Sequence, residues 1–547
     1  MLYARFSSAT GAGITNTYDN VGELLSATTN MDGTARTLTS QYDADGNRTS
    51  LGLSGGGSGT FSYDGLDRLT SFTSGATSVA WFTYDQLGRR SSLAKGFGSA
   101  MSSTSYSYDG ASRLQSLTFD LAGTANDQVL GFGYNPASQM VQRTRSNSGW
   151  EFTEQVLGTK SYGINGLNQY TTAAGATFAY DANGNLSSDG TNTYIYDAEN
   201  RLVSVKNASG TVISTLSYDP MGRLWRFTSS ASSTTLDFVY DGDQLLAEYD
   251  GSGVLQRAYA HGPGEDEPIY WFEVSDHSSR FFQADHQGSI VAVTDGSGNP
   301  IAIDKYDEWG VPSAANVGRF QYTGQVLLPD LGFYYYKARI YSSRLGRFLQ
   351  TDPVGYKDQI NLYAYVGNDP VDGRDPLGQF DLKAGSAVEA VDYQTEINSL
   401  SYTKYSFDEH NELHSTGTFN TGVRSRTFSK YIDRMIASRR TTILRRGDTY
   451  KDNGVQHTVA STGGGVTLIG AGKSSPITVI TDGKSYDKAP AMEGGTLHQT
   501  PAQVDMHEMV VHALSAVMNI PESLANENKI RKEINLPLRA HDHDHPN

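Results

Sequence analysis

The chain has no cysteine among its 547 residues. Disulfide bonds, thiol catalysis and cysteine-ligated zinc are therefore excluded, and any metal site must use histidine and carboxylate ligands. Long apolar runs are absent as well, since none reaches the roughly 18 residues of a transmembrane helix. The first residues, MLYARFSSATGAG, lack the charged start and apolar core of a signal peptide. We therefore expect neither a membrane span nor a signal peptide.

Positive charge is also scarce, with 43 Lys and Arg against 59 Asp and Glu and a net charge of −16. Because contacts to nucleic-acid phosphates need a basic surface, we do not expect the body of the chain to bind nucleic acid. Glycine and tyrosine are abundant instead, at 58 and 33 residues. This composition is typical of short strands joined by tight turns, and the length predicts several domains in a mainly β protein.

A Tyr-Asp unit recurs roughly every 20 residues, usually followed by Gly or Asn and then by Arg or Leu. Clear copies are Tyr18-Asp19, Tyr42-Asp43, Tyr63-Asp64, Tyr84-Asp85, Tyr108-Asp109, Tyr180-Asp181, Tyr196-Asp197, Tyr218-Asp219 and Tyr240-Asp241. Each unit predicts a hairpin in which a strand ends at Tyr-Asp and Gly or Asn takes the positive-φ turn position. One hairpin cannot bury its own face, so we expect successive hairpins to form a long sheet or solenoid. The Tyr and Asp side chains are then scaffold residues.

Two Asp-Pro-x-Gly motifs begin at Asp352 and Asp375, where the composition of the chain changes. Such motifs are common turn signatures, and turns alone would explain them. Two carboxylates brought together can instead share a proton, so that one activates water and the other donates to a peptide carbonyl. The spacing would fit a strand, a turn and a returning strand over Leu362 to Val366. Residue types alone leave both interpretations open.

The Tyr-Asp units, with the runs FFQADHQGSIVAVTDGSGNPIAIDKYDEWG and LGFYYYKARIYSSRLGRFLQTDPVG, resemble the Rhs, or YD-repeat, family of polymorphic toxins. The resemblance implies a mainly β fold, a YD-repeat β-solenoid or β-shell (cocoon) followed by a small α+β toxin domain. It divides the chain into a YD-repeat shell over 1–260, an Rhs core over 261–378 and a C-terminal toxin domain over 379–547. The toxin domain would be the shell's encapsulated cargo.

Self-cleavage is the second property that this resemblance implies. In the family the paired Asp residues, here Asp352 and Asp375, act as an aspartyl autoprotease that cuts just after the second motif. The cleavage region is then Gln379, Phe380 and Asp381. Arg347 and Arg374 lie next to the motifs in the sequence and could orient a carboxylate, although ordinary surface positions would also explain them.

A capped helix is predicted from Thr500, where Thr, Pro and Gln have the spacing of a capping box. It carries His507, Glu508 and His512. Zinc peptidases of the HExxH type place two histidines one helical turn apart, with the glutamate activating water. The HExxxH spacing here is one residue longer, which puts the two histidines about 140° apart on a regular helix. A π-type turn would bring them together; a coincidental motif is the alternative.

The third zinc ligand is predicted on the following helix. There Glu527 lies among the apolar residues Leu524, Ile530 and Ile534, where a carboxylate must be paired or bound to metal. Glu522, on the polar side, is the alternative ligand. The run HALSAVMNIPESLANENKIRKEINLPLR resembles the NleD-like effector peptidases, which implies a zincin-like toxin.

Together these patterns predict a bacterial toxin with a self-cleaving shell and a zinc-dependent peptidase cargo. Its expected partners are a cognate immunity protein, a peptide or protein substrate, and a type VI spike, toxin-complex component or adaptor chaperone. The protein would be made in the cytoplasm and then secreted or delivered into target cells. Two alternatives remain, a YD-repeat protein for surface adhesion or carbohydrate binding and an Rhs carrier with another toxin, such as a nuclease.

Overall fold

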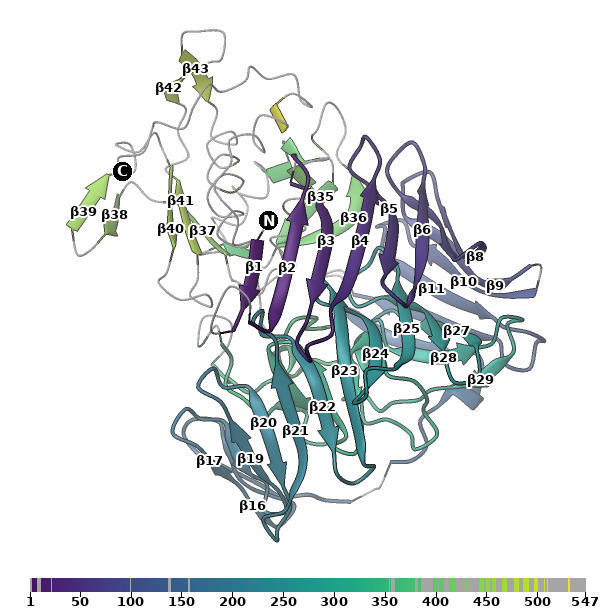
Figure 1. Ribbon diagram of the computed structural model, residues 1–547, viewed down its shortest axis with the longest axis vertical. Coiled ribbons are helices and arrows are strands. Elements are labelled where there is room, and N and C mark those ends of the chain that lie inside the picture. Colours follow the sequence, from purple (N-terminus) through teal and green to yellow (C-terminus); the bar gives the residue numbers. More distant parts are fainter. Residues whose placement is uncertain are drawn as a thin grey trace. The chain divides into compact units, whose positions relative to one another are not determined.

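The computed structural model describes residues 2–378 except for 7–10, 21, 99, 136–138, 156–157, 354 and 356–359 (Figure 1). Beyond Gly378 it describes only separate segments. The chain divides into two compact units. The first comprises Met1–Asp85, Arg90–Asp352 and Gln359–Gly378, and the second Gln86–Arg89, Pro353–Asp358 and Gln379–Asn547. Within the described residues, no helix combines the length and hydropathy needed to cross a membrane.

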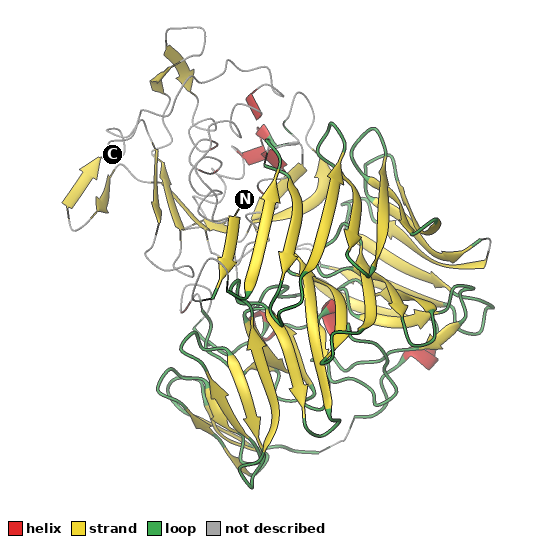
Figure 2. Cartoon of the chain, in the orientation of Figure 1, coloured by secondary structure: helices red, strands yellow, loops and turns green. Residues whose placement is uncertain are grey.

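The first unit is mainly β, as predicted, and is dominated in its described part by two antiparallel 13-stranded sheets (Figure 2). In both sheets each strand pairs with the next one along the chain. The first sheet contains β1 (Leu2–Arg5), β2 (Gly13–Tyr18), β3 (Leu24–Thr29), β4 (Arg36–Tyr42), β5 (Arg48–Leu53), β6 (Gly57–Tyr63), β7 (Leu69–Ser74), β8 (Thr77–Tyr84), β9 (Arg90–Phe97), β10 (Ala100–Tyr108), β11 (Leu114–Asp120), β12 (Gln128–Tyr134) and β13 (Met140–Arg145). The second contains β17 (Ala179–Tyr180), β18 (Leu186–Ser188), β19 (Thr193–Tyr196), β20 (Leu202–Lys206), β21 (Val212–Tyr218), β22 (Leu224–Ser229), β23 (Thr234–Asp241), β24 (Gln244–Asp250), β25 (Leu255–His261), β26 (Pro268–Glu273), β27 (Ser278–Ala284), β28 (Ile290–Thr294) and β29 (Pro300–Ala302).

Two smaller sheets and three single-turn 3-10 helices complete the regular structure described for this unit. The sheets are β14 (Tyr162–Ile164), β15 (Tyr170–Ala173) and β16 (Ala176–Thr177), and then β30 (Val326–Leu328), β31 (Phe333–Tyr336), β32 (Arg339–Ser342) and β33 (Arg347–Phe348). The helices are η1 (Ser148–Trp150), η2 (Tyr322–Gly324) and η4 (Val366–Asn368).

The described strands of the second unit include a four-stranded sheet in the order β34 (Leu382–Ala384), β37 (Thr442–Arg446), β41 (Ile477–Thr481) and β40 (Gly465–Ile469). Its first three strands run parallel, and β40 is antiparallel to β41. Three strand pairs accompany it: β35 (Thr403–Phe407) with β36 (Leu413–Phe419), β38 (Thr449–Asp452) with β39 (Val455–Thr458), and β42 (Tyr486–Pro490) with β43 (Thr496–Gln499).

Each hairpin turn is organised by the aspartate of its Tyr-Asp unit. Asp219 shows the pattern: one carboxylate oxygen accepts the N–H groups of Met221 at 2.8 Å and Arg223 at 3.0 Å, and the other accepts Nε of Arg223 at 2.8 Å. Gly222 takes the positive-φ position at +83°, which glycine adopts without strain. Asp64, Asp109 and Asp197 make the same bonds. The aspartate therefore closes the turn.

In most units the tyrosine connects its hairpin to the preceding one through its hydroxyl group. The hydroxyl of Tyr218 donates to the carbonyl oxygen of Leu202, at the start of the previous strand, over 2.8 Å. The same bond, at 2.6–3.1 Å, is made by Tyr42, Tyr63, Tyr84, Tyr108, Tyr134, Tyr196, Tyr240 and Tyr306. The arginine of the turn completes the contact, since Arg201 lies 4.8 Å from the centre of the Tyr218 ring, within the range of cation–π attraction. The repeated residues thus have a structural role, because they join consecutive hairpins.

The two large sheets pack against each other through an apolar cluster. Leu69, Phe72, Val79, Phe82 and Leu93 come from β7–β9, and the facing residues are Ala260, Ile269, Tyr270 and Phe281 from β25–β27. A second cluster joins the second sheet to the β30–β33 sheet and includes Leu202, Phe227, Leu328 and Ile340. All four of these side chains are at most 1% exposed. The β30–β33 sheet therefore packs against the second large sheet through a fully buried apolar interface.

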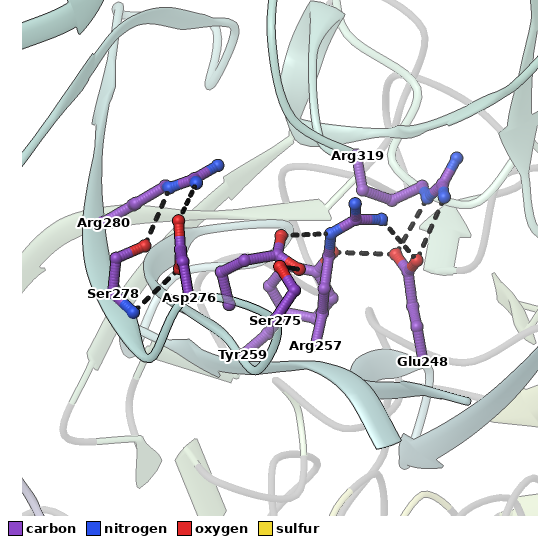
Figure 3. Close-up of polar contacts among 9 residues, drawn as sticks. Glu248, Arg257, Tyr259, Ser275, Asp276, Ser278, Arg280 and Arg319 are labelled. Atoms are coloured by element: carbon purple, nitrogen blue, oxygen red, sulfur yellow. Dashed lines mark hydrogen bonds and ion pairs between the residues drawn. The ribbon is translucent and has the colours of Figure 1, made fainter. Parts of the chain in front are cut away.

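A buried ion cluster also ties this part of the chain to the second sheet (Figure 3). Glu248 on β24 is fully buried and accepts two bonds from Arg319, at 2.8 and 3.0 Å, and one from Tyr259 at 2.7 Å. Arg257 lies 3.2 Å from it. Burial opposes ionisation, but the charges of Arg319 and Arg257 outweigh it and hold the pKa of Glu248 below its ordinary value. Residues after β29 are thereby anchored.

One expected element is absent: residues 362–366 do not form the returning strand between the two Asp-Pro-x-Gly motifs. Tyr363, Ala364 and Tyr365 are all buried, whereas a strand with one covered face would alternate. Positive φ angles at Val366 and Gly367 then turn the chain into η4. This prediction was wrong: Ala364 pairs with Arg347 in an isolated antiparallel bridge, and the left-handed backbone at Val366 and Gly367 ends the extended segment.

The tyrosine bonds lead to a test of the scaffold. Tyr218→Phe leaves the buried carbonyl of Leu202 without its donor, so we expect it to lower the free energy of unfolding by about 1–3 kcal/mol. The matched control is Tyr162→Phe, because Tyr162 is 43% exposed. Urea unfolding followed by tyrosine and tryptophan fluorescence measures both. Equal midpoints for the two variants would contradict the assigned role.

Candidate functional site

The candidate site is built around Arg339, the first residue of β32. This strand lies in the middle of the β30–β33 sheet, between β31 and β33, and Arg339 is only 2% exposed. A buried guanidinium is stable only if charged or polar groups surround it. The aromatic run on either side, FYYYKARIY, supplies the apolar environment that makes these partners necessary.

Two carboxylates from distant parts of the chain meet at this guanidinium. Nη1 of Arg339 lies 2.8 Å from Oδ2 of Asp352, and Nη2 lies 3.2 Å from Oδ2 of Asp375. The side chain of Asp352 is fully buried, and that of Asp375 is 16% exposed. Asp352 is also held through its backbone, because its N–H donates to the carbonyl of Leu362 at 3.0 Å. The structure therefore brings the two predicted aspartates to one cation.

Aromatic rings line the buried side of this arrangement. The ring of Phe348 lies 3.7 Å from the guanidinium carbon of Arg339. Tyr336, Tyr341 and Tyr365 are fully buried next to it and contact one another edge to face or tilted. Burial raises the pKa of Tyr365 to about 12, and the nearby charge of Asp375 adds to the rise. The carboxylates thus face a rigid, water-poor wall.

The loop that carries Asp375 is held tightly up to Gly378. The carbonyl oxygen of Gly378 accepts Nε of Arg339 at 2.6 Å, and the N–H of Ala338 donates to the carbonyl of Leu377 at 3.2 Å. Gly378 has φ +67°, and a Cβ there would lie 2.5 Å from the carbonyl oxygen of Tyr336. Only glycine fits at this position without movement of the backbone.

The two arginines predicted to orient the carboxylates lie elsewhere. Arg347 donates to the carbonyl of Asn168 at 2.5 Å, and its guanidinium lies 3.7 Å from the ring of Tyr170. Arg374 is exposed, and its positive charge acts on Glu265. Burial and the charge of Asp266 raise the pKa of Glu265 to about 7, against the opposing charges of Lys337 and Arg374.

Arg339 is the functional candidate that sequence reasoning missed. The signal was present, because a lone arginine in an apolar, aromatic run must find carboxylate partners once it is buried. Proximity in the sequence pointed to Arg347 and Arg374 instead. The contacts of Arg339 with the two aspartates arise from the pairing of β32 with β31 and β33, not from proximity in the sequence.

The other predicted site residues lie outside the described residues. These are the cleavage region, Gln379, Phe380 and Asp381, and the zinc-site residues, His507, Glu508, His512 and Glu527. In the part of the chain that the structure describes, no group of three or more His, Asp or Glu side chains is placed to hold a metal ion. Met506 and Met509, which flank His507 and Glu508, are described and fully buried.

Comparison with known proteins identifies the repeat region. The family model for the Teneurin YD-shell matches residues 79–371. The tRNA nuclease WapA of Bacillus subtilis is 32% identical over 235 residues, which is 41% of this chain and 10% of that protein. The double-stranded DNA deaminase toxin A of Burkholderia cenocepacia is 28% identical over 329 residues, 52% of this chain and 23% of that protein. The chain therefore spans about a tenth to a quarter of these relatives.

Solved structures with the same fold come from a toxin complex. The crystal structure of TcdB2-TccC3 matches with a TM-score of 0.52 at 17% identity, covering 67% of this chain and 24% of the matched chain. The form without the hypervariable C-terminal region matches with a TM-score of 0.51 at 16% identity, with the same two shares. These matches show that the two large sheets have the architecture of a Tc-toxin β-shell.

The close approach at Gly378 leads to a test with a matched control. Gly332 has a similar φ, +65°, but a Cβ there meets nothing within 4 Å. Gly332→Ala should therefore cost only the strain of a left-handed alanine, about 1–2 kcal/mol. Gly378→Ala adds a collision with Tyr336 and should lower the thermal unfolding midpoint further. Equal midpoints would show that the loop adapts freely at Gly378.

Proposed function

This chain belongs to the Teneurin YD-shell family, and from that membership we propose that it is the carrier of a bacterial toxin that releases a C-terminal domain by cutting itself. The cut follows the second Asp-Pro-x-Gly motif, within Gln379, Phe380 and Asp381. Asp352 and Asp375 perform it. The observation that carries this proposal is the bridge that Arg339 forms between these two carboxylates.

The chemistry follows from two carboxylates at one cation. The mechanism needs one proton shared by the pair, which the repulsion between two nearby carboxylates favours and the charge of Arg339 opposes. The ionised carboxylate removes a proton from water, whose oxygen attacks the peptide carbonyl carbon, while the protonated one donates to the carbonyl oxygen. When the C–N bond breaks, the proton taken from water passes to the leaving amine. The products are a new carboxyl terminus and a new amino terminus, with no redox change.

Arg339 contributes by holding both carboxylates in fixed orientations. Its three nitrogens are used by different partners: Nη1 by Asp352, Nη2 by Asp375 and Nε by the carbonyl of Gly378. A planar guanidinium fixes these directions relative to one another. The aromatic wall limits water on the opposite side, which strengthens the electrostatic interactions.

The self-cleavage proposal is tested by replacing each aspartate. The wild-type chain should give two fragments on a denaturing gel, with masses that place the cut just after Gly378. Asp352→Asn and Asp375→Asn should each leave a single band, because an amide neither takes a proton from water nor donates as an acid. Asp372→Asn, on the same loop but exposed, should cut normally.

An intact wild-type chain, or fragments from both asparagine variants, would refute self-cleavage. Folding of the variants is checked by their unfolding midpoints, since Asn has nearly the volume of Asp. A variant that folds normally and stays intact is the informative outcome.

For the cargo we propose a zinc-dependent peptidase in residues 379–547. The donor set of His507, His512 and Glu527 fits zinc, which accepts nitrogen and oxygen ligands. Met509, between the two histidines, has a π-helical conformation, which is the local geometry that HExxxH needs to direct both histidines to one side. Zinc bound there would acidify a water molecule and polarise a peptide carbonyl. In such a site Glu508 would act as the general base for water and would pass the proton to the leaving amine.

A nuclease or deaminase cargo is the alternative, because the curated relatives are named for acting on tRNA or DNA. In either case the cargo needs a cognate immunity protein in the producing cell. It also needs a route into the target, through a type VI spike, a toxin-complex component or an adaptor chaperone. The proposed route is synthesis in the bacterial cytoplasm followed by secretion or delivery.

The two cargo assignments are separated by one variant. Expression of the full chain in the bacterial cytosol should inhibit growth, and Glu508→Ala should abolish this effect while zinc remains bound. Glu493→Ala is the control, since the sequence analysis gives Glu493 no ligand or catalytic role. Metal analysis should give about one zinc per wild-type chain and less in His507→Ala. Undiminished toxicity of Glu508→Ala, with cleaved tRNA or deaminated DNA, would refute the peptidase.

A further inference from the structure

A cavity of about 390 Å³ lies between the two large sheets, with β4–β9 on one side and β23–β27 on the other. Its walls include Phe72 and Tyr270, which belong to the apolar cluster of β7–β9 and β25–β27. They also include Leu53, which packs against the cluster of Val239 and Tyr249. The cavity is therefore bounded by packed side chains and is formed by the fold itself, as most small-molecule sites are.

Small residues on both walls explain why the sheets leave this space. Gly57 and Gly59 of β6 lie in the glycine-rich run SGGGSG, and Ala258 and Ala260 of β25 face the cavity from the other sheet. A Cβ at Gly59 would lie 2.4 Å from a ring carbon of Phe72, so this position requires glycine. Because none of these four residues has more than a methyl group, the side chains of both sheets stop short of one another.

The neighbouring side chains on both walls are aromatic. The ring centres of Phe61 and Phe72 on the first sheet are 5.3 Å apart, and Phe72 lies 6.2 Å from Tyr270 on the second. Strand pairing places Tyr270 opposite Ala260 and Phe272 opposite Ala258. Aromatic rings pack favourably against further rings in tilted or edge-to-face contacts. The space between these walls therefore suits an aromatic ring.

Charge is balanced within the lining. Arg48 and Asp241 are its only Lys, Arg, Asp or Glu residues, and Nη1 of Arg48 lies 2.5 Å from Oδ2 of Asp241. His261 is buried and donates from Nε2 to the carbonyl oxygen of Leu245 at 2.9 Å. Burial lowers its pKa, so the ring is uncharged at neutral pH. A charged ligand would lose its water here without gaining an unpaired counter-ion.

We propose that this cavity binds an uncharged aromatic molecule of roughly 15 non-hydrogen atoms. At about 30 Å³ per water molecule, its 390 Å³ equals the volume of roughly 13 waters, which sets that size. The rim residues Ser58, Gly75 and Thr77 are exposed, so a ligand can enter from solvent. The proposal depends neither on self-cleavage nor on the chemistry of the cargo.

Two dyes that differ by one charge test the proposal on the full chain. The uncharged dye 1-anilinonaphthalene, whose emission rises when it leaves water, should bind saturably at one site per chain. Its sulfonate, 1-anilinonaphthalene-8-sulfonate, has the same rings and should bind at least about tenfold more weakly, because it finds no unpaired cation. No saturable binding of the uncharged dye, or equal binding of both dyes, would overturn the proposal.

Filling the cavity tests its position. Ala258→Phe should weaken binding of the uncharged dye at least about tenfold without lowering the thermal unfolding midpoint, because the ring enters empty space. Ser74→Phe fills the cavity from the opposite wall and should have the same effect on binding. Ala111→Phe, at an exposed turn, is the control. Folded Ala258→Phe and Ser74→Phe chains that bind the dye like the wild type would show that it binds elsewhere.

Releasing the charge of Arg48 gives a test by gain of binding. Asp241→Asn leaves the volume of the cavity nearly unchanged and removes the counter-ion, so the sulfonate should bind about tenfold more tightly and the uncharged dye as before. Asp276→Asn is the matched control, since Asp276 pairs with Arg280 outside the lining. An unchanged affinity for the sulfonate in a folded Asp241→Asn chain would contradict the assigned site.

Discussion

The structure depends on a hydrogen bond that crosses from one hairpin to the next, from a tyrosine hydroxyl to a carbonyl at the start of the preceding strand. A sheet of 13 consecutive strands has no covalent crosslink, since the chain lacks cysteine, and each hairpin alone is marginal. The tyrosine ring supplies apolar area, its hydroxyl satisfies a carbonyl, and the arginine of the neighbouring turn covers its face. Because the aspartate of the turn holds that arginine, three residue types maintain one contact.

Against this repetitive background, the region after β29 departs from the repeat. Most of its aromatic residues gather around the β30–β33 sheet, and several of its charged residues are buried in pairs. Glu248 with Arg319 fixes one end, and Arg339 with its two aspartates fixes the other. Buried ion pairs contribute little net stability but impose a particular geometry on the groups around them. The repeats therefore form the supporting sheets, and the irregular segment holds the two aspartates of the proposed cleavage site.

Sequence reasoning recovered the repeat and missed the contacts that reach across it. The Tyr-Asp spacing predicted the hairpins because the turn chemistry is local, within about five residues. The meeting of Asp352 and Asp375 was expected from a family resemblance, and the structure brings them to one cation. Arg339 was not foreseen, since its partners are set by strand order rather than by neighbours in sequence. The strand expected over residues 362–366 does not form, because left-handed φ angles at Val366 and Gly367 turn the chain there.

The hydrogen bonds that Gln287, Lys337 and Arg339 donate to the carbonyl oxygens of residues 370–378 also bear on the kinetics of the proposed reaction. Enzyme and substrate are one covalent chain, so the rate would be first order and independent of protein concentration, and the tether replaces binding affinity. After hydrolysis the upstream product still occupies the site through the carbonyls that Gln287, Lys337 and Arg339 hold. Nothing in this arrangement favours exchange for a second substrate, so each chain would act once. Such a protein would catalyse a single irreversible cut, and the carboxyl terminus that the cut creates would stay bound in the site.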